Sequence, residues 1–299
     1  MTPAKLANLA KPEKVAKWKT NSANDRTKET DQAGGLRGLL VSDLHSGSVV
    51  SPAVPKARTD YSGGTVGLNP FQRSFLLPRW KEMCSAGPYD FIVVNGDLVD
   101  GLNRKSRGTG LWTYLLDLQA ENAARLLGMI ETQPDAPIFI LGGTEYHVDS
   151  NPGMDQVVAE KLGALGKNAH YKGLEHLLTY GSQKFHFSHW ASNAMYDGTA
   201  LSKEVLLSQK HEIDLTGMVR GHRHHYGMYT NGFRFSAMLP AWKGRDEFVQ
   251  GRGMLFATVQ IGWVDFNITG DSWALQPHLW NLRDFIPKTT LGGRSETFQ

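Results

Sequence analysis

The sequence predicts an α/β fold whose metal-binding residues lie at the ends of buried strands. Short apolar runs that break into polar residues recur along the chain, and segments with helical spacing of apolar residues lie between them. Asp and His residues follow four of these runs. Such runs are typical of parallel strands that are buried on both faces and joined by crossover helices. We therefore expect functional side chains to gather at the carboxyl edge of a sheet.

The first three strands are predicted from apolar runs in the first half of the chain. They contain the segments GLLVSDLH, YDFIVVNGDLVDG and PIFILGGTEYH, within residues 36–45, 89–101 and 137–147. Residues 111–131 carry Leu, Ala and Ile near helical spacing, which predicts a crossover helix between the second and third strands. A second helix is predicted at 152–165, because Pro152 is tolerated near a helix start, where its missing N–H costs least.

The second half continues this alternation and then changes to hairpins. Its next predicted elements are a strand at 184–190, a helix at 198–211 and a strand at 215–222. Thr199 is the expected N-cap of that helix. Asn231-Gly232 lies between two strand-like runs and residues 254–268 alternate in their second half, so the C-terminal third is predicted to be antiparallel. The Gly-, Pro- and Ser-rich segment 46–67 predicts a long loop.

The composition indicates one large domain preceded by a basic segment. With 40% apolar residues in a chain of 299, a sizeable core can be buried, and we expect residues 35–299 to form it. Residues 1–34 hold seven Lys and Arg against four Asp and Glu, a surplus equal to the net charge of +3 of the whole chain. We interpret them as a solvated tail or frayed helix, with a weak nucleic-acid contact as the alternative.

Several classes of protein are excluded by what the sequence lacks. No run approaches the roughly 18 apolar residues of a membrane span, and the N-terminus has no apolar signal segment, so we expect a cytoplasmic protein. Cys84 is the only cysteine, which leaves His, Asp and Glu to hold any metal. The GxxxxGK[ST] and GxSxG patterns are absent, which argues against nucleoside-triphosphate motors and serine hydrolases.

Metal-binding side chains follow four of the predicted strands. They are Asp43 and His45, Asp97 and Asp100, His189, and His222 and His224. An Asp-x-His string is expected about 0.6 times by chance in this composition, but Gly-Asp-x-x-Asp-Gly only about 0.01 times and Gly-His-x-His about 0.04 times. The last two strings, found in this order, are therefore a specific signal of a metal centre.

The strings SDLH, NGDLVDG, SHW and GHRHH, in this order at strand ends, resemble the motifs of the calcineurin-like metallophosphoesterase superfamily. The resemblance covers residues 36–226. Asn69, Gln72 and Trp80, together with the string GTEYH, are most similar to members encoded by phages or prophages, for which the host cytoplasm is the expected location. The resemblance implies a four-layer α/β/β/α sandwich with two metal ions.

The resemblance also assigns roles to the candidate ligands. Asp43, His45 and His224 would hold the first ion, His189 and His222 the second, and Asp97 would bridge both. Mixed oxygen and nitrogen ligation suits transition metals better than Mg²⁺, so we expect Mn²⁺ first, with Fe, Zn or Ni as alternatives. The implied reaction is phosphoester hydrolysis by a metal-bridging hydroxide that attacks phosphorus in line.

One motif departs from the family pattern. The family has Gly-Asn-His-Asp or Gly-Asn-His-Glu after the third strand, whereas this chain has GGTEYHV, with Thr144 at the Asn position. His147, the candidate general acid, follows three residues later instead of one. We expect a shifted loop that still brings His147 to the leaving group; the alternative is a weaker second ion. Glu145 is a candidate oxygen ligand, and Asp100 is expected to orient a neighbour rather than to bind metal.

Two classes of function remain open at this point. The first is a phosphoester hydrolase, with a phosphodiesterase or nuclease favoured over a phosphomonoesterase acting on proteins or small molecules. A phosphoester substrate, including nucleic acid, is the expected partner. The second is a non-catalytic, metal-stabilised binding module, which Thr144 in place of Asn would explain. The sequence leaves the oligomeric state open.

Overall fold

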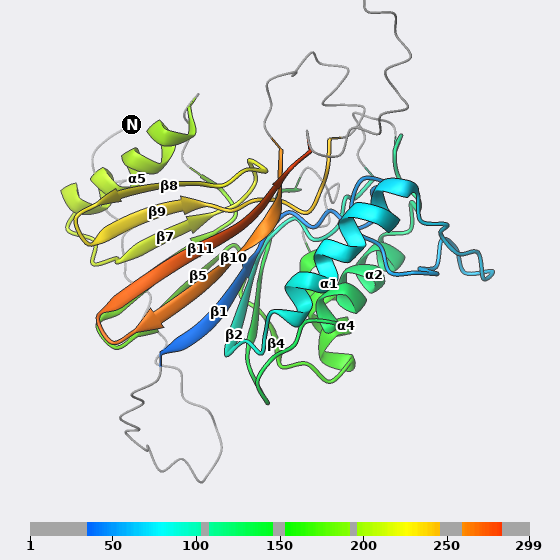
Figure 1. The fold of residues 1–299 in the computed structure, drawn as a ribbon, viewed down its shortest axis with the longest axis horizontal. Coiled ribbons are helices and arrows are strands. Elements are labelled where there is room, and N and C mark those ends of the chain that lie inside the picture. Colours follow the sequence, from blue (N-terminus) through cyan, green and yellow to red (C-terminus); the bar gives the residue numbers. More distant parts are fainter. Residues whose placement is uncertain (1–34, 103–107, 146–152, 192–195, 246–258, 283–299) are drawn as a thin grey trace, which may run out of the picture. The chain divides into compact units, whose positions relative to one another are not determined.

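The computed structural model describes residues 35–102, 108–145, 153–191, 196–245 and 259–282. The strands of its first sheet are β1 (Leu36–Val41), β2 (Phe91–Asn95), β3 (Ile138–Leu141), β4 (Ala169–Tyr171), β10 (Gln260–Thr269) and β11 (Ser272–Asn281). Those of the second sheet are β5 (Glu175–Tyr180), β6 (Gln183–Ser188), β7 (Gly217–Arg220), β8 (Gly227–Asn231) and β9 (Arg234–Met238). The strand order is β11-β10-β1-β2-β3-β4 in the first sheet and β5-β6-β7-β9-β8 in the second (Figure 1).

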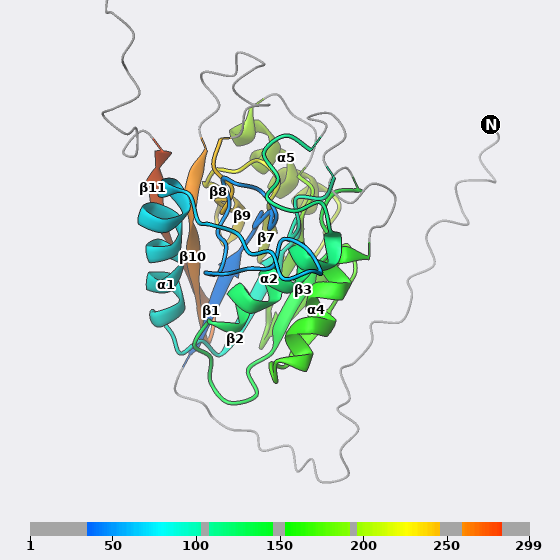
Figure 2. The ribbon, with the colours of Figure 1, turned by 90° about the vertical axis from the view of Figure 1, so that its right-hand side faces the viewer.

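Helices cover the outer faces of the two sheets. They are α1 (Leu77–Ser85), preceded by a short π-helix η2 (Gln72–Leu76), α2 (Leu116–Gly128), α4 (Met154–Ala164) and α5 (Asp197–Lys210). The first three α-helices pack on the first sheet, whereas α5 packs on β8 and β9 of the second (Figure 2). The predicted four-layer α/β/β/α sandwich is thereby confirmed. Within the described segments, no helix is both long and apolar enough to cross a membrane.

The apolar runs of β1, β2 and β3 fill two separate cores. Alternate residues such as Leu40 and Val93 face the second sheet, where they join Phe187 and Phe266. The residues between them, Val41 among others, face the helices. Successive side chains of a strand point to opposite faces, so a strand buried on both sides needs a continuous apolar run. This explains why the strands are easy to recognise in the sequence.

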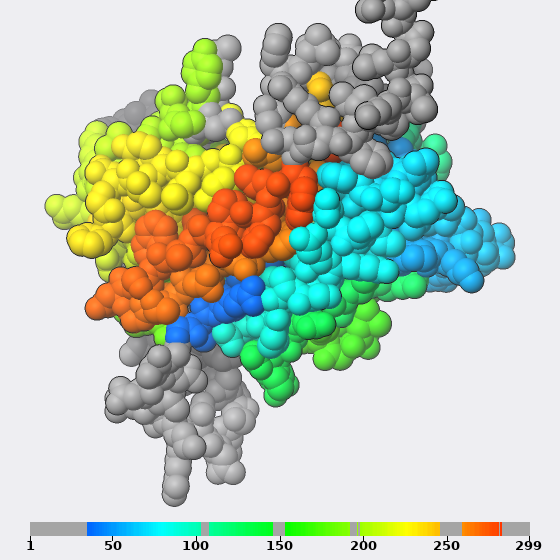
Figure 3. Space-filling view, in the orientation of Figure 1, coloured from blue at the N-terminus to red at the C-terminus, as the bar shows by residue number. Residues whose placement is uncertain are grey.

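The parallel strands deliver their carboxyl ends to one edge of each sheet. β1, β2 and β3 pair in parallel in the first sheet, and β6 pairs in parallel with β7 in the second. The antiparallel strands β10 and β11 lie beside β1. In Figure 3 their side chains form a strip between those of the β8–β9 hairpin and those of α1.

Some expectations needed correction. The segment 72–85 is helical although no helix was predicted there, because its apolar residues pack under the long loop against the helical layer. Thr199 lies inside α5, which begins at Asp197 after Tyr196 without a side-chain cap. The C-terminal third is antiparallel in the β8–β9 and β10–β11 hairpins, but β9 pairs in parallel with β7. β9 lies between β7 and β8 in the second sheet, so only its pairing with β8 is that of a hairpin.

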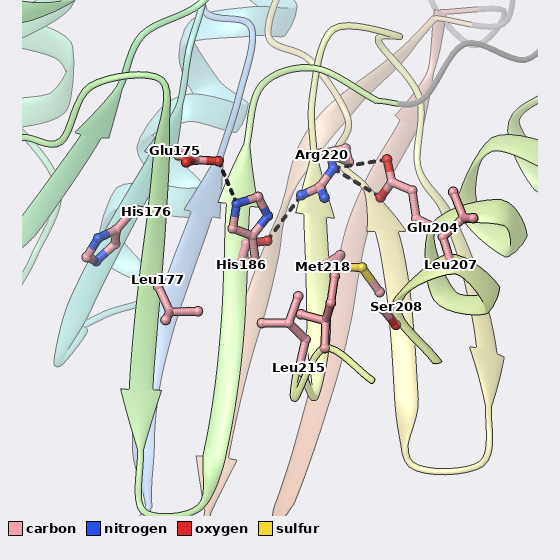
Figure 4. Close-up of a pocket in the computed structure, with 11 residues that line it drawn as sticks. Glu175, His176, Leu177, His186, Glu204, Leu207, Ser208, Leu215, Met218 and Arg220 are labelled. Atoms are coloured by element: carbon pink, nitrogen blue, oxygen red, sulfur yellow. Dashed lines mark hydrogen bonds and ion pairs between the residues drawn. The ribbon is translucent and has the colours of Figure 1, made fainter. Parts of the chain in front are cut away.

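A buried ion pair holds the end of β7, the strand that leads to His222. Arg220 is 7% exposed, and its Nε lies 3.0 Å from Glu204 Oε2 of α5. Its Nη1 donates to the carbonyl oxygens of His186 and Val219 over 3.2 and 2.9 Å. Figure 4 shows the contacts of Arg220 with Glu204 and His186 at one end of a pocket on the outer face of the second sheet. Arg220 therefore ties β7 to both β6 and α5.

Replacing Arg220 by Met should destabilise the fold by about 3–5 kcal/mol, because Glu204 would remain buried without its counter-charge. Urea unfolding of the metal-free protein measures this change. Lys184→Met is the control, since Lys184 pairs with Asp214 at the surface, where such pairs contribute about 0–1 kcal/mol. Equal effects of the two substitutions would contradict the anchoring role of Arg220.

Candidate metal centre

The ends of β1, β2, β6 and β7 meet at one place, where the motif residues form two groups. The first group contains Asp43, His45 and His224, and the second contains Asp97, His189 and His222. In each group the possible ligand atoms lie within 4.8 Å of one another. The structure therefore brings together all six residues that the sequence selects as ligands.

The distances within and between the groups fit divalent cations. His224 Nε2 lies 3.2 Å from Asp43 Oδ1, and His189 Nε2 lies 3.1 Å from Asp97 Oδ2. Across the groups, Asp43 Oδ1 lies 3.7 Å from His189 Nε2, and His45 Nε2 lies 3.8 Å from Asp97 Oδ2. Ligand atoms that share one ion at 2.0–2.2 Å lie about 3.0–3.6 Å apart. The two groups are thus adjacent and connected through their carboxylates.

Two buried atoms at the centre lack the partners that buried polar atoms normally have. Within the described part of the chain, neither Asp43 Oδ1 nor His189 Nε2 makes a hydrogen bond. Asp43, His45 and His189 are fully buried, and Asp97 is 3% exposed. Buried polar atoms are nearly always satisfied, so such exceptions need an explanation. A bound divalent cation would supply those partners, because carboxylate oxygen and imidazole nitrogen are both metal ligands in proteins.

The turns after the strands have an uncommon backbone conformation. Asp43, His45, Asp97, His222 and His224 all have positive φ, between 46° and 73°. They are five of the eight non-glycine residues with positive φ among those that the structure describes. This region is uncommon for residues with a side chain, and such strain concentrates at functional sites. The left-handed turns direct the side chains of each motif into the centre.

Glycines let the turns approach one another closely. A Cβ atom at Gly143 would lie 2.2 Å from the backbone nitrogen of Asp97, and one at Gly221 would lie 2.3 Å from Ser42 Oγ. Both distances are far below van der Waals contact. The backbone hydrogen bond from His45 N to Asp97 O, 2.9 Å long, joins the first two turns. Side chains at Gly143 and Gly221 would therefore force the motifs apart.

Two of the histidines are oriented through the ring nitrogen that faces away from the centre. His189 Nδ1 lies 2.6 Å from the carbonyl oxygen of Asn95. His45 Nδ1 lies 3.1 Å from Asp100 Oδ1, which also accepts a hydrogen bond from Lys243 Nζ over 2.8 Å. A partner at Nδ1 fixes the tautomer and leaves Nε2 for the metal. Asp100 therefore lies where it can orient the ring of His45.

Thr144, in the motif that follows β3, contacts Asp97, and none of the residues of this motif that the structure describes belongs to either ligand group. Thr144 N donates to Asp97 Oδ1 over 2.6 Å, and the Thr144 hydroxyl lies 3.1 and 3.2 Å from the two carboxylate oxygens. Glu145 is exposed and belongs to neither group. His147 lies outside the described residues. Thr144 thus positions the carboxylate that faces both groups.

Charges at the centre shift the pKa values of its ligands in opposite directions. Burial alone would raise the pKa of Asp43, but the facing His189 and His224 outweigh it and hold this pKa well below its usual range. Burial disfavours the charged form of His189, yet Asp97 and Asp43 raise its pKa to about 10. For His222, burial together with His189 lowers the pKa. The carboxylates of Asp43 and Asp97 therefore favour positive charge on His189, whereas His222 is kept neutral by burial and by His189.

The sequence motifs do not include two further buried charged residues next to the centre. Asp155, in the first turn of α4, accepts hydrogen bonds from Leu98 N and Gly143 N over 3.1 and 2.7 Å. Burial, with a contribution from Asp97, raises the pKa of Asp155 to about 6. Lys243, beyond β9, contacts Asp100. The position of Asp155 in the first turn of a predicted helix is only a weak sign of a functional role. Nothing in the sequence around Lys243, which follows the apolar run LPAW, indicates one.

Comparisons with known proteins find likeness in structure only. A scan against protein-family models finds no match, and a search of curated proteins finds no similar sequence. The chain is similar to an archaeal phosphodiesterase, with 9% identity, 82% of this chain and 100% of the other covered, and a TM-score of 0.41. It is also similar to Zn²⁺-bound Vps29 from Entamoeba histolytica, with 10% identity, 82% of this chain and 99% of the other covered, and a TM-score of 0.36. For a predicted phosphoesterase from Streptococcus pneumoniae, the identity is 11%, the coverage is 84% of this chain and 91% of the other, and the TM-score is 0.33.

Proposed function

We propose that the chain is a metal-dependent phosphoester hydrolase of the phosphodiesterase or nuclease type, with two divalent transition-metal ions, Mn²⁺ being the preferred one. The observation that carries this proposal is the pair of adjacent ligand groups, each with one carboxylate and two imidazoles. Paired ions of this kind are suited to stabilising both the attacking and the leaving oxygen in phosphoryl displacement.

Each ligand has a defined part in this proposal. Asp43, His45 and His224 would hold one ion, and His189 and His222 the other. Asp97 Oδ2 lies 3.1 Å from His189 Nε2 and 3.8 Å from His45 Nε2, and these distances support a role for its carboxylate in holding both ions. When bound, the ions supply Lewis acidity and lower the pKa of water toward neutrality. Thr144 and the strained turns keep the ligands in place before substrate binds.

An exposed aromatic residue next to the centre supports a substrate with a planar group. Trp190 follows His189 directly, is 52% exposed, and has its ring centroid 4.8 Å from that of His222. An exposed indole beside a metal ligand offers a surface on which a nucleobase or aryl group can stack, worth about 1–3 kcal/mol per base.

Trp190→Ala should therefore raise KM for bis(p-nitrophenyl) phosphate about 5- to 100-fold, with a smaller change in kcat. The matched substrate is methyl p-nitrophenyl phosphate, whose methyl group cannot stack. Steady-state kinetics on the two diesters measure the difference. Both diesters share the p-nitrophenyl leaving group, so an equal change in KM would contradict stacking of Trp190 on the aryl group that remains on phosphorus.

His147 is the proposed general acid for the leaving group. If so, His147→Ala should reduce turnover of an alkyl phosphodiester about 100-fold or more, since general acids contribute about 10²–10⁴-fold. The reduction should be much smaller for p-nitrophenyl esters, because p-nitrophenolate leaves without a proton. Rates on both substrates measure this contrast. Equal losses with good and poor leaving groups would argue against the assignment.

The experiment that tests the proposed function is Mn²⁺-dependent release of p-nitrophenol from bis(p-nitrophenyl) phosphate, run beside the monoester p-nitrophenyl phosphate. Asp97→Asn gives the background rate. Faster turnover of the diester that is lost in the variant would support the proposal. Preference for the monoester would indicate a phosphomonoesterase instead.

A second candidate, a non-catalytic metal-stabilised binding module, is favoured by one observation. The hydroxyl of Thr144 is engaged with Asp97, at the position where the resembled family has an amide side chain. This candidate predicts tight Mn²⁺ binding without turnover of either ester. Nucleic-acid binding that falls steeply with salt and is lost on deleting residues 1–34 would then give the basic segment a role.

A further inference from the structure

Lys243 is a buried cation beside the metal centre. Its side chain is 6% exposed, and it is the one buried lysine in the part of the chain that the structure describes. Its Nζ donates to Asp100 Oδ1 over 2.8 Å, across 143 positions of sequence. An ammonium group that leaves water needs a paired charge to offset the loss of hydration. Asp100 provides that charge and thereby allows Lys243 to be buried.

The same carboxylate oxygen also faces a metal ligand. Asp100 Oδ1 lies 3.1 Å from His45 Nδ1. On the opposite side of the ring, His45 Nε2 lies 3.7 Å from Asp43 Oδ1. A carboxylate this close to Nδ1 favours the tautomer with its proton on that nitrogen, which leaves the Nε2 lone pair directed into the centre. Lys243, Asp100 and His45 thus form a chain of contacts that ends at the first ligand group.

The backbone fixes the position of Lys243 relative to this group. On one side of Lys243, Trp242 N donates to the carbonyl oxygen of Asp43 over 3.0 Å. On the other side, Gly244 N donates to the carbonyl oxygen of Val50 over 2.8 Å. Both acceptors belong to the segment that follows β1 and carries His45. The ammonium group is therefore held in register with the ligand that Asp100 orients.

We propose that Lys243 is a positioning residue for the ion held by Asp43, His45 and His224. By balancing the charge of Asp100 in a buried site, Lys243 keeps this carboxylate as an acceptor for His45 Nδ1 and so aligns Nε2 with the ion. The inference rests on the metal centre of the proposed function. It predicts that Lys243 affects one of two metal-binding events and leaves the other unchanged.

The test is calorimetric titration of the full-length, metal-free chain with Mn²⁺. Lys243→Met should weaken one binding event about 10- to 100-fold, the range found for partners of metal ligands, and leave the other unchanged. Lys243→Arg, which keeps a charged donor for Asp100, should retain most of the affinity. The matched control is Lys161→Met, because Lys161 Nζ lies 2.7 Å from Asp117 away from the centre, and it should bind like wild type.

The outcomes separate this inference from the proposed function. Two unchanged binding events in a folded Lys243→Met variant would overturn the role of Lys243, whereas no binding of Mn²⁺, Zn²⁺ or Ni²⁺ by wild type would overturn both. If Lys243→Met does not fold, the double variant Lys243→Met/Asp100→Asn decides, since it removes both charges and keeps an amide oxygen for His45. Binding of both ions near wild-type affinity is expected, and continued weakening of one would overturn the inference.

Discussion

Replacing Asp97 by Asn is expected to reduce metal-dependent phosphodiester turnover at least about a thousandfold. The substitution keeps the shape of the side chain and one oxygen for the bond from Thr144 N, which is 2.6 Å long. It removes the negative charge shared by the two ligand groups. Because paired ions contribute several kcal/mol of transition-state stabilisation, and each 1.36 kcal/mol is tenfold in rate, loss of one ion accounts for this size of effect.

The control for this prediction is Asp117→Asn, a change of the same kind at a half-exposed residue that pairs with Lys161. It should leave kcat/KM for bis(p-nitrophenyl) phosphate within about twofold of wild type, since surface pairs contribute little. Circular dichroism of both metal-free variants shows whether they fold. Turnover above one tenth of wild type in a folded Asp97→Asn variant would contradict the bridging role.

Adding Mn²⁺ to the metal-free chain should raise its free energy of unfolding by about 5 kcal/mol when the free ion is at 100 times Kd for each site. Binding at that concentration contributes about 2.7 kcal/mol per site. For a chain of this size the gain corresponds to a rise in Tm of roughly 8–10 °C. The physical reason is that the ions satisfy Asp43 Oδ1 and His189 Nε2, which are buried without hydrogen bonds in the described part of the chain.

Differential scanning calorimetry with and without EDTA measures this shift. His224→Gln, which alters the first group alone, should keep about half of the stabilisation, and Mg²⁺ should give less than Mn²⁺ because it prefers oxygen ligands. No rise in Tm with Mn²⁺, Zn²⁺ or Ni²⁺ would contradict the metal centre itself.

The fold and the ligand set differ in why they could be predicted. The strands were visible because Leu40, Val93 and their neighbours are buried on both faces, which requires unbroken apolar runs. The ligands were visible because they directly follow those runs. Lys243 was not, since its contact with Asp100 joins positions 143 residues apart that no local pattern connects. The helical segment 72–85 was missed because its packing partners are distant in sequence and its mean hydropathy is low.

The two ligand groups each draw on both sheets. In the first group, Asp43 and His45 follow β1 of the first sheet, whereas His224 follows β7 of the second. In the second group, Asp97 follows β2 of the first sheet, whereas His189 and His222 follow β6 and β7 of the second. A bound ion is therefore a cross-link between the two inner layers, at the edge where the aromatic core between them ends. Opening of the sandwich would have to break both cross-links at once. Backbone amides of β2 and β7 should consequently exchange with solvent as one cooperative unit when the ions are bound, and separately after chelation.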